Sequence, residues 1–232
     1  MKTNRLFLLS LFIIILNITS CSKFSLFSET ETKYHYEILK EINDTMTNYP
    51  EVAMELLNTI DSSTIHNRFS KQEYHEYQIL LSEASYKNYY NQPNINEIID
   101  ACDYFDSLTA LHPNNFEVLF LNSRAHYYRA VGLEELGETE KAFKSYLQSL
   151  ELNENINYKS FRISDKFYKE LLHFKALTYS RFGDILYWHD VSNAAIECIS
   201  NANILFEIED NQSVLSRNNI IMAVIYGLNN DH

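Results

Sequence analysis

The chain contains few of the residues that make tight turns, with four glycines and three prolines among 232 residues. A β-sandwich or barrel reverses direction about every ten residues, and turns with positive φ are largely supplied by glycine. Four glycines cannot serve that many turns, and collagen-like or low-complexity classes fail on the same count. The three cysteines, an odd number, exclude a small disulfide framework. What remains is an all-α globular chain, long enough to bury roughly 70% of its unfolded surface.

The first twenty residues form a secretory signal. Lys2 and Arg5 precede the apolar run 6–16, and small residues come before Cys21, which is the usual order in such signals. The run is too short for a membrane span, which needs roughly twenty residues. We therefore expect residues 1–20 to be removed.

The residues before Cys21, Ile18-Thr19-Ser20, resemble the bacterial lipobox, after which signal peptidase II cuts in front of a lipidated cysteine. The resemblance implies that Cys21 carries diacylglycerol and that the protein is a lipoprotein of the bacterial cell envelope. An ordinary signal peptide with a chance cysteine is the alternative. Residues 21–32 show no helical pattern and are interpreted as the lipidated cysteine with a flexible tether. The composition after Cys21 favours an outer-membrane anchor that faces the periplasm, and surface exposure stays open.

Acidic residues outnumber basic ones, 31 to 19. Removing residues 1–20 takes away Lys2 and Arg5 and no acid, so the mature charge becomes 17 minus 31, or −14. A surface this acidic repels phosphate backbones. We expect no nucleic-acid partner and a membrane contact made through the N-terminal lipid.

From residue 33 onward, apolar residues recur at spacings of three and four, which is typical of amphipathic helices. Pro50, Pro93 and Gly137 mark the joins between them, in agreement with the usual helix start and stop signals. About nine helices are predicted, at 33–47, 50–60, 70–90, 95–111, 115–136, 139–152, 164–188, 191–207 and 213–228.

Residues 123–154 resemble a tetratricopeptide repeat, a helical hairpin in which small residues at fixed positions let helices approach closely. Here those positions and the large residues between them are Ala130, Leu133, Ala142, Tyr146 and Ser149. A second copy holds Tyr179, Phe182, Gly183, Leu186, Ala195, Ile199 and Ala202, and a weaker third has Ala84, Ala101, Phe105 and Pro113. The resemblance implies a tetratricopeptide-like helical-hairpin superhelix over residues 33–232. A generic helical bundle is the alternative.

A narrower resemblance covers residues 54–61, 77–89 and 98–105, which are similar to the N-terminal half of tetratricopeptide lipoproteins and sensor-like proteins of Bacteroidetes. Many of those proteins continue into a transmembrane helix and a DNA-binding domain. This sequence shows neither after the repeats, so the resemblance supports the repeat scaffold and leaves a signalling output open.

Motifs for catalysis are scarce. No His-Glu-x-x-His spacing occurs, the glycines never cluster into a phosphate loop, and His189 beside Asp190 falls at a predicted inter-helix turn, where a solvated or capping role is expected. Cys102 and Cys198 are expected to be packed as small apolar residues, and a disulfide between them is the weaker alternative. We expect a protein that is not an enzyme and needs no cofactor or metal.

Tetratricopeptide stacks bind partners in a concave groove lined by the first helix of each hairpin, and the resemblance transfers this groove to specific positions. They are Gln78, Leu81, Ser85, Asn88, Tyr89, Arg124, Tyr127, Val131, Glu134, Glu135, Asp184, Tyr187 and Trp188. Trp, Tyr and Arg are frequent anchors of protein interfaces, and the only tryptophan falls in this set. The alternative for Trp188 is that it closes its hairpin against the next helix.

The leading prediction is a lipoprotein whose repeat scaffold binds a protein or peptide partner. Glycan binding, as in lipoproteins of polysaccharide-uptake systems, and a truncated relative of a tetratricopeptide sensor are the alternatives. A hydrolase would need a cleft-forming domain for which the sequence has no segment left.

Overall fold

The structure is a computed structural model that describes residues 37–92, 95–156, 165–189, 191–208, 215 and 218–225. All regular secondary structure in these ranges is helical. The chain divides into two compact units, Met1–Leu80 and Leu81–His232, and the division falls inside helix α4 (Lys71–Lys87). The signal peptide, Cys21 and the tether predicted at 1–32 lie outside the described residues, as does Pro93.

In the first unit, residues 37–46 form a helix, followed by α2 (Pro50–Thr59), α3 (Ser62–Asn67) and the first part of α4. Proline stands in the first turn of α2, where its fixed φ suits a helix start and its missing N–H costs nothing. Leu39, Ile42, Ala53 and Leu57 are fully buried and supply the apolar interior of this unit.

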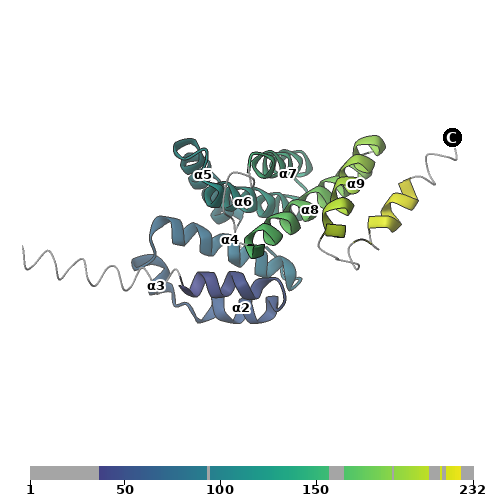
Figure 1. Cartoon of the computed structure of the whole chain (residues 1–232). Coiled ribbons are helices and arrows are strands. Elements are labelled where there is room, and N and C mark those ends of the chain that lie inside the picture. Colours follow the sequence, from purple (N-terminus) through teal and green to yellow (C-terminus); the bar gives the residue numbers. More distant parts are fainter. Residues whose placement is uncertain are drawn as a thin grey trace, which may run out of the picture. The chain divides into compact units, whose positions relative to one another are not determined.

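The second unit continues with α5 (Ile95–Leu111), α6 (Phe116–Glu135), α7 (Thr139–Glu154), α8 (Asp165–Trp188) and α9 (Ser192–Ile208). Each of these helices except α9 packs against the next one in sequence, and α6 also contacts α8. Figure 1 shows α6 beside α7 and α8 beside α9. The all-α class and the helical hairpins are thereby confirmed.

The small residues predicted to lie between helices are buried. Ala84, Ala101, Ala130, Ala142, Ala195 and Ala202 have no exposed surface. In the α6–α7 hairpin the Ser123 hydroxyl donates to the Ser149 carbonyl oxygen at 3.0 Å, and the Ser149 hydroxyl donates to the Ser123 carbonyl oxygen at 2.9 Å. These reciprocal bonds need short side chains on both helices, so they fix how closely α6 and α7 approach.

Gly183 serves the same purpose in the α8–α9 hairpin. A Cβ at this position would lie 2.6 Å from Ile199 Cγ1 and 3.2 Å from the Ala195 carbonyl oxygen. Both separations are closer than normal contacts, so only glycine allows this approach of α8 to α9. The prediction of a small residue at this repeat position is confirmed by the contact.

Candidate binding surface

Three helices of the second unit run parallel, as their contacts show. Between α6 and α8 the Phe120 and Phe167 ring centroids lie 5.1 Å apart, the Tyr127 and Phe174 centroids 5.1 Å apart, and the Arg181 Nε donates to Glu134 Oε2 at 3.1 Å. All three pairs have the same sequence separation of 47 residues. A constant separation arises only when two helices point the same way.

The last turns of α4 pair with α6 in the same manner. Arg124 donates to Glu83, and the rings of Tyr86 and Tyr127 meet edge to face at 6.5 Å, both with a separation of 41 residues. The described ends of α4, α6 and α8 therefore point to one side of this unit. These are the first helices of the three predicted hairpins.

The N-terminal members of the predicted groove are buried. Gln78 in the first unit, and Ser85, Arg124 and Tyr127 in the second, present almost no surface. Burial raises the pKa of Tyr127 well above its ordinary value, as expected for a phenol without water around it. The structure buries these four side chains, whereas the sequence predicted them on an accessible lining.

Arg124 is held by a buried ion pair with Glu83, which also binds Lys87 Nζ at 2.7 Å. Burial alone would raise the pKa of Glu83, but the two cations outweigh it and hold this pKa at about 2. Removing one partner of such a pair leaves an uncompensated buried charge. The role of Arg124 that the geometry supports is therefore structural.

The middle members of the predicted groove are joined in a network between α6, α7 and α8. Glu134 Oε2 accepts from the Tyr146 hydroxyl at 2.7 Å and from Arg181 Nε at 3.1 Å, and Arg181 lies 4.0 Å from Asp184. Burial raises the pKa of Tyr146 well above its usual range. This network ties α8 to the preceding hairpin and leaves Glu134 and Asp184 little freedom to change partners.

The C-terminal members are the accessible ones. Trp188 is 79% exposed at the last residue of α8, so it does not close the hairpin against the next helix. Tyr187 beside it is half-buried, with the two ring centroids 5.5 Å apart. Asn88 is half-buried and donates to the Ala84 carbonyl oxygen. Of the predicted positions, those at the helix ends reach solvent.

Tyr89 follows the end of α4 in an unusual backbone conformation. Its φ is 58°, in the left-handed region that disfavours residues with a Cβ. The Tyr90 N–H bonds to the Ser85 carbonyl and the Tyr89 N–H to the Tyr86 carbonyl, which is the Schellman pattern of helix ends. At the end of α6 the same two bonds surround Gly137, whose φ is 74°. Tyr89 therefore occupies a position that glycine usually holds, and the sequence pattern did not predict this.

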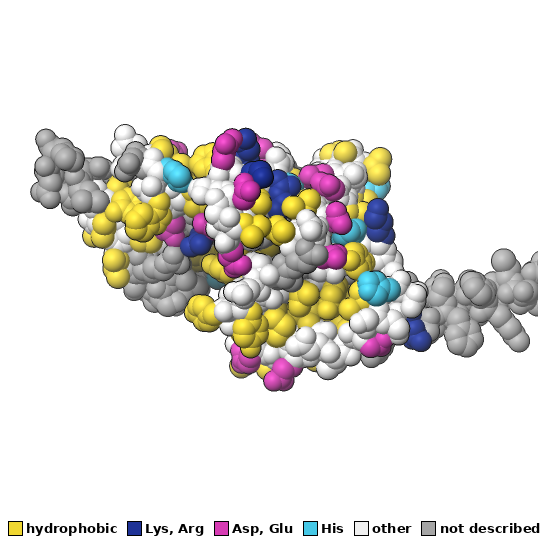
Figure 2. Space-filling model, turned by 180° about the vertical axis from the view of Figure 1, so that it is seen from behind, with side chains coloured by type: hydrophobic (Ala, Val, Ile, Leu, Met, Phe, Trp, Pro, Cys, Tyr) yellow, Lys and Arg dark blue, Asp and Glu magenta, His cyan; other side chains and the backbone are white. Residues whose placement is uncertain are grey.

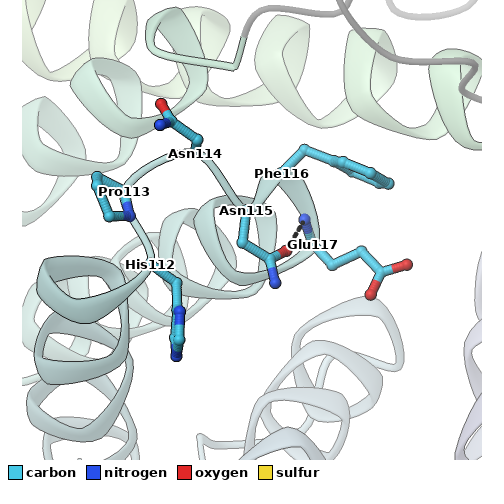
Figure 3. Close-up of a pocket in the computed structure, with 6 residues that line it drawn as sticks. All are labelled: His112, Pro113, Asn114, Asn115, Phe116 and Glu117. Carbon is cyan, nitrogen blue, oxygen red and sulfur yellow. Dashed lines mark hydrogen bonds between the residues drawn. The ribbon is translucent and has the colours of Figure 1, made fainter.

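A separate pocket of about 510 Å³ lies at the connection between α5 and α6. Its described lining comes from six consecutive residues, 112–117, which are drawn in Figure 3. The Asn115 side-chain oxygen accepts from the Glu117 N–H at 3.1 Å and caps α6 (Figure 3). Among these six residues, His112 and Glu117 carry the ionisable side chains. The described lining of this pocket is thus the turn that leads into α6.

Within the described residues, no three His, Cys, Asp or Glu side chains lie close enough together to hold a metal ion. Cys102 and Cys198 are free thiols there. Burial raises the pKa of Cys102 to about 12 and that of Cys198 to about 11, so both stay protonated at neutral pH. None of the helices in the described ranges combines the length and the apolar character that crossing a bilayer requires.

On the face drawn in Figure 2, Lys and Arg side chains are interspersed with Asp and Glu side chains, and hydrophobic side chains are exposed beside them. Comparison of the chain with protein-family models and with curated proteins found no match.

Proposed function

We propose that the protein is a lipid-anchored scaffold of the bacterial cell envelope whose tetratricopeptide-like hairpins bind a protein or peptide partner. The observation that carries the proposal is the contrast between Glu134, which is bonded to Tyr146 and Arg181, and Trp188, which stands exposed at a helix end. Tryptophan is the residue most enriched among side chains that dominate binding energy at protein interfaces. An exposed tryptophan costs solubility and adds nothing to folding, so a partner that covers it is the simplest account.

The membrane part of the proposal rests on the sequence alone. The lipobox-like residues before Cys21 imply an N-terminal lipid, and two or more acyl chains hold a protein stably at a membrane. The tether of residues 21–32 would keep the hairpins close to that surface. We place the protein at the outer membrane, facing the periplasm.

The proposal is tested by photo-crosslinking in cells. A photoreactive residue in place of Tyr187, next to Trp188, should give a defined crosslink to one envelope protein, and Trp188→Ala should reduce the yield about tenfold. The matched control is Leu111→Ala, which removes a side chain that is 73% exposed at the end of α5 and should leave the yield unchanged. An equal yield from the Trp188→Ala and unmodified proteins would reject the proposed surface.

Glycan binding is separated from this by titration. The fluorescence of the single tryptophan reports on any ligand that covers Trp188. If polysaccharides change this fluorescence saturably and no protein crosslinks, the partner is a glycan and the proposed protein partner is wrong.

A further inference from the structure

The exposed side chains at the ends of α4, α6 and α8 suggest what kind of partner the second unit accepts. We infer that they form one surface that binds a Lys- or Arg-containing segment of a protein, with apolar residues between its cations. This tip surface consists of Tyr89, Tyr90, Glu135, Leu136, Glu138 and Trp188. The inference rests on the proposed function and adds the location of the site and the chemistry of the partner.

The residues of the tip surface come together from three connections. The Gln92 N–H donates to Glu135 Oε2 at 3.0 Å, which fastens the segment after α4 to the end of α6. The rings of Phe143 in α7 and Phe182 in α8 lie 4.8 Å apart. Because α7 returns antiparallel to α6, and α8 runs parallel to α6, the residues beyond Phe182 lie level with those before Phe143. Trp188 is thereby level with the α6–α7 connection.

The tip surface is open to a partner. Tyr89 is 97% exposed, Leu136 61% and Tyr90 59%. A Cβ built on Gly137, next to Leu136, would meet no atom within 4 Å. Large apolar side chains left exposed in this way, where they gather on one surface, are typical of interaction sites.

Tyr89 supplies an independent reason to expect a ligand. A residue other than glycine in the left-handed region destabilises the fold, and its exposed ring recovers none of this through burial. Gly137 shows that the same helix end is made without strain. A strained residue that does not help the fold is best explained by a contact that its ring makes outside the chain.

The charge of the tip surface determines the partner. The described connections 88–92, 135–138 and 187–189 contain Glu135 and Glu138 and no Lys or Arg. Glu138 lies 3.1 Å from Lys141, but this pair is exposed, and such pairs bind weakly. Carboxylates beside the faces of Tyr and Trp rings recognise Lys and Arg side chains through ion pairs and cation–π contacts. The chain's net charge of −12 attracts cations and disfavours both a second copy of this chain and anionic lipid.

The test uses the purified full chain and three short synthetic peptides. The peptides share their Leu and Phe positions and differ only in the residues between them, which are Lys and Arg, Ser, or Glu. Fluorescence anisotropy of a dye on each peptide measures binding. The cationic peptide should bind in a salt-dependent manner, with the serine peptide at least about tenfold weaker and the glutamate peptide weaker still.

Variants locate the binding site. Tyr89→Gly and Trp188→Ala should each weaken binding of the cationic peptide about tenfold, and the pair Glu135→Gln with Glu138→Gln should abolish most of its salt dependence. Leu111→Ala, outside the tip surface, should leave the affinity unchanged. Circular dichroism of each variant confirms that it is folded.

Three results would overturn the inference. They are equal binding of all three peptides or of none, unchanged affinity in the tip variants, and tip-dependent binding to phosphatidylcholine vesicles or self-association in light scattering. If a protein still crosslinks next to Trp188 while these tests fail, the proposed function stands and the basic partner is wrong. If no protein crosslinks next to Trp188, the proposed function itself is rejected, whatever the peptide tests show.

Discussion

Two glycines in helix interiors allow a sharp test of how closely the helices are packed. A Cβ on Gly183 would meet Ile199 Cγ1 at 2.6 Å, the Ala195 carbonyl oxygen at 3.2 Å and Cys198 Cβ at 3.3 Å. A Cβ on Gly132 would meet only the tip of a flexible side chain, Ile95 Cδ1 at 2.7 Å, with its other neighbours near 4 Å. The atoms around Gly183 cannot move without a shift of α9, whereas the contact at Gly132 is relieved by rotation of the Ile95 side chain.

Both Gly→Ala substitutions gain the same intrinsic helix propensity, about 0.8–1 kcal/mol. The difference between them therefore isolates the cost of the contact. Overpacking of a rigid site costs about 1–3 kcal/mol, so Gly183→Ala should be less stable than Gly132→Ala by about 2 kcal/mol. For a chain of this size that is about 4–8 °C in melting temperature, measured by circular dichroism on matched samples.

A double-mutant cycle identifies the clashing group. Ile199→Ala removes the closest atom, so its cost should be smaller in the Gly183→Ala background than in the unmodified protein, with a coupling of about 1 kcal/mol. If Gly183→Ala and Gly132→Ala change the melting temperature equally, α9 does not lie as close to α8 as described. The argument from small residues between helices would then be refuted for this hairpin.

Five further substitutions have definite expected outcomes. Tyr89→Gly should raise the free energy of unfolding by about 1 kcal/mol because it relieves the left-handed backbone, and Gly137→Ala should lower it by a similar amount; urea titration checks both. Arg124→Met should cost about 1.5–3 kcal/mol in the same assay because it removes one of the two cations bonded to the buried Glu83 and leaves only Lys87. Folding holds the pKa of Glu83 at about 2, below the ordinary 4.5, so its stabilisation is present above pH 4.5 and is lost between pH 4.5 and 2; Glu83→Gln should flatten acid unfolding in that window. Cys21→Ala should release the protein from the membrane fraction, and continued retention would refute the lipid anchor.

The helices were predictable because their boundaries are marked by local signals. The spacing of apolar residues predicts 95–111, and the structure has α5 at Ile95–Leu111. The predicted 50–60 ends one residue later than α2, and the predicted 191–207 is shifted by one residue at each end from α9. Proline at a helix start and glycine at a helix end act within one turn, so neighbouring segments do not change their effect.

The sequence did not predict α3, a helix too short to show an apolar repeat. The start of α3 was nevertheless marked in the sequence by Asp61, three residues before Thr64. The Asp61 carboxylate accepts a hydrogen bond from the Thr64 N–H at 3.0 Å. Such capping aspartates are common in turns that do not continue into helices, which is why the residue alone does not decide between the two. None of the α3 side chains is buried, so periodicity carried no information there.

The candidate site was predicted less well because burial depends on helices far away in the sequence. The repeat pattern predicts that Arg124 and Tyr127 line the concave groove. Whether the two side chains are exposed depends on how closely α8 approaches α6. The ring centroids of Phe174 in α8 and Tyr127 in α6 lie 5.1 Å apart. No spacing within α6 reports that distance. The pattern within α6 therefore could not show that these two side chains are buried.

The end of α4 shows how a small change in helix length creates a surface. Tyr89, Glu135 and Trp188 share one position in the repeat pattern, but α6 and α8 continue helically through that position, whereas α4 ends at Lys87. The early end puts Tyr89 outside the helix with its ring exposed and sends the following residues to the end of α6, where Gln92 binds Glu135. A helix two residues longer would keep Tyr89 in regular backbone without strain and would displace Gln92 from Glu135. The strain at Tyr89 and the assembly of the tip surface thus have the same structural cause.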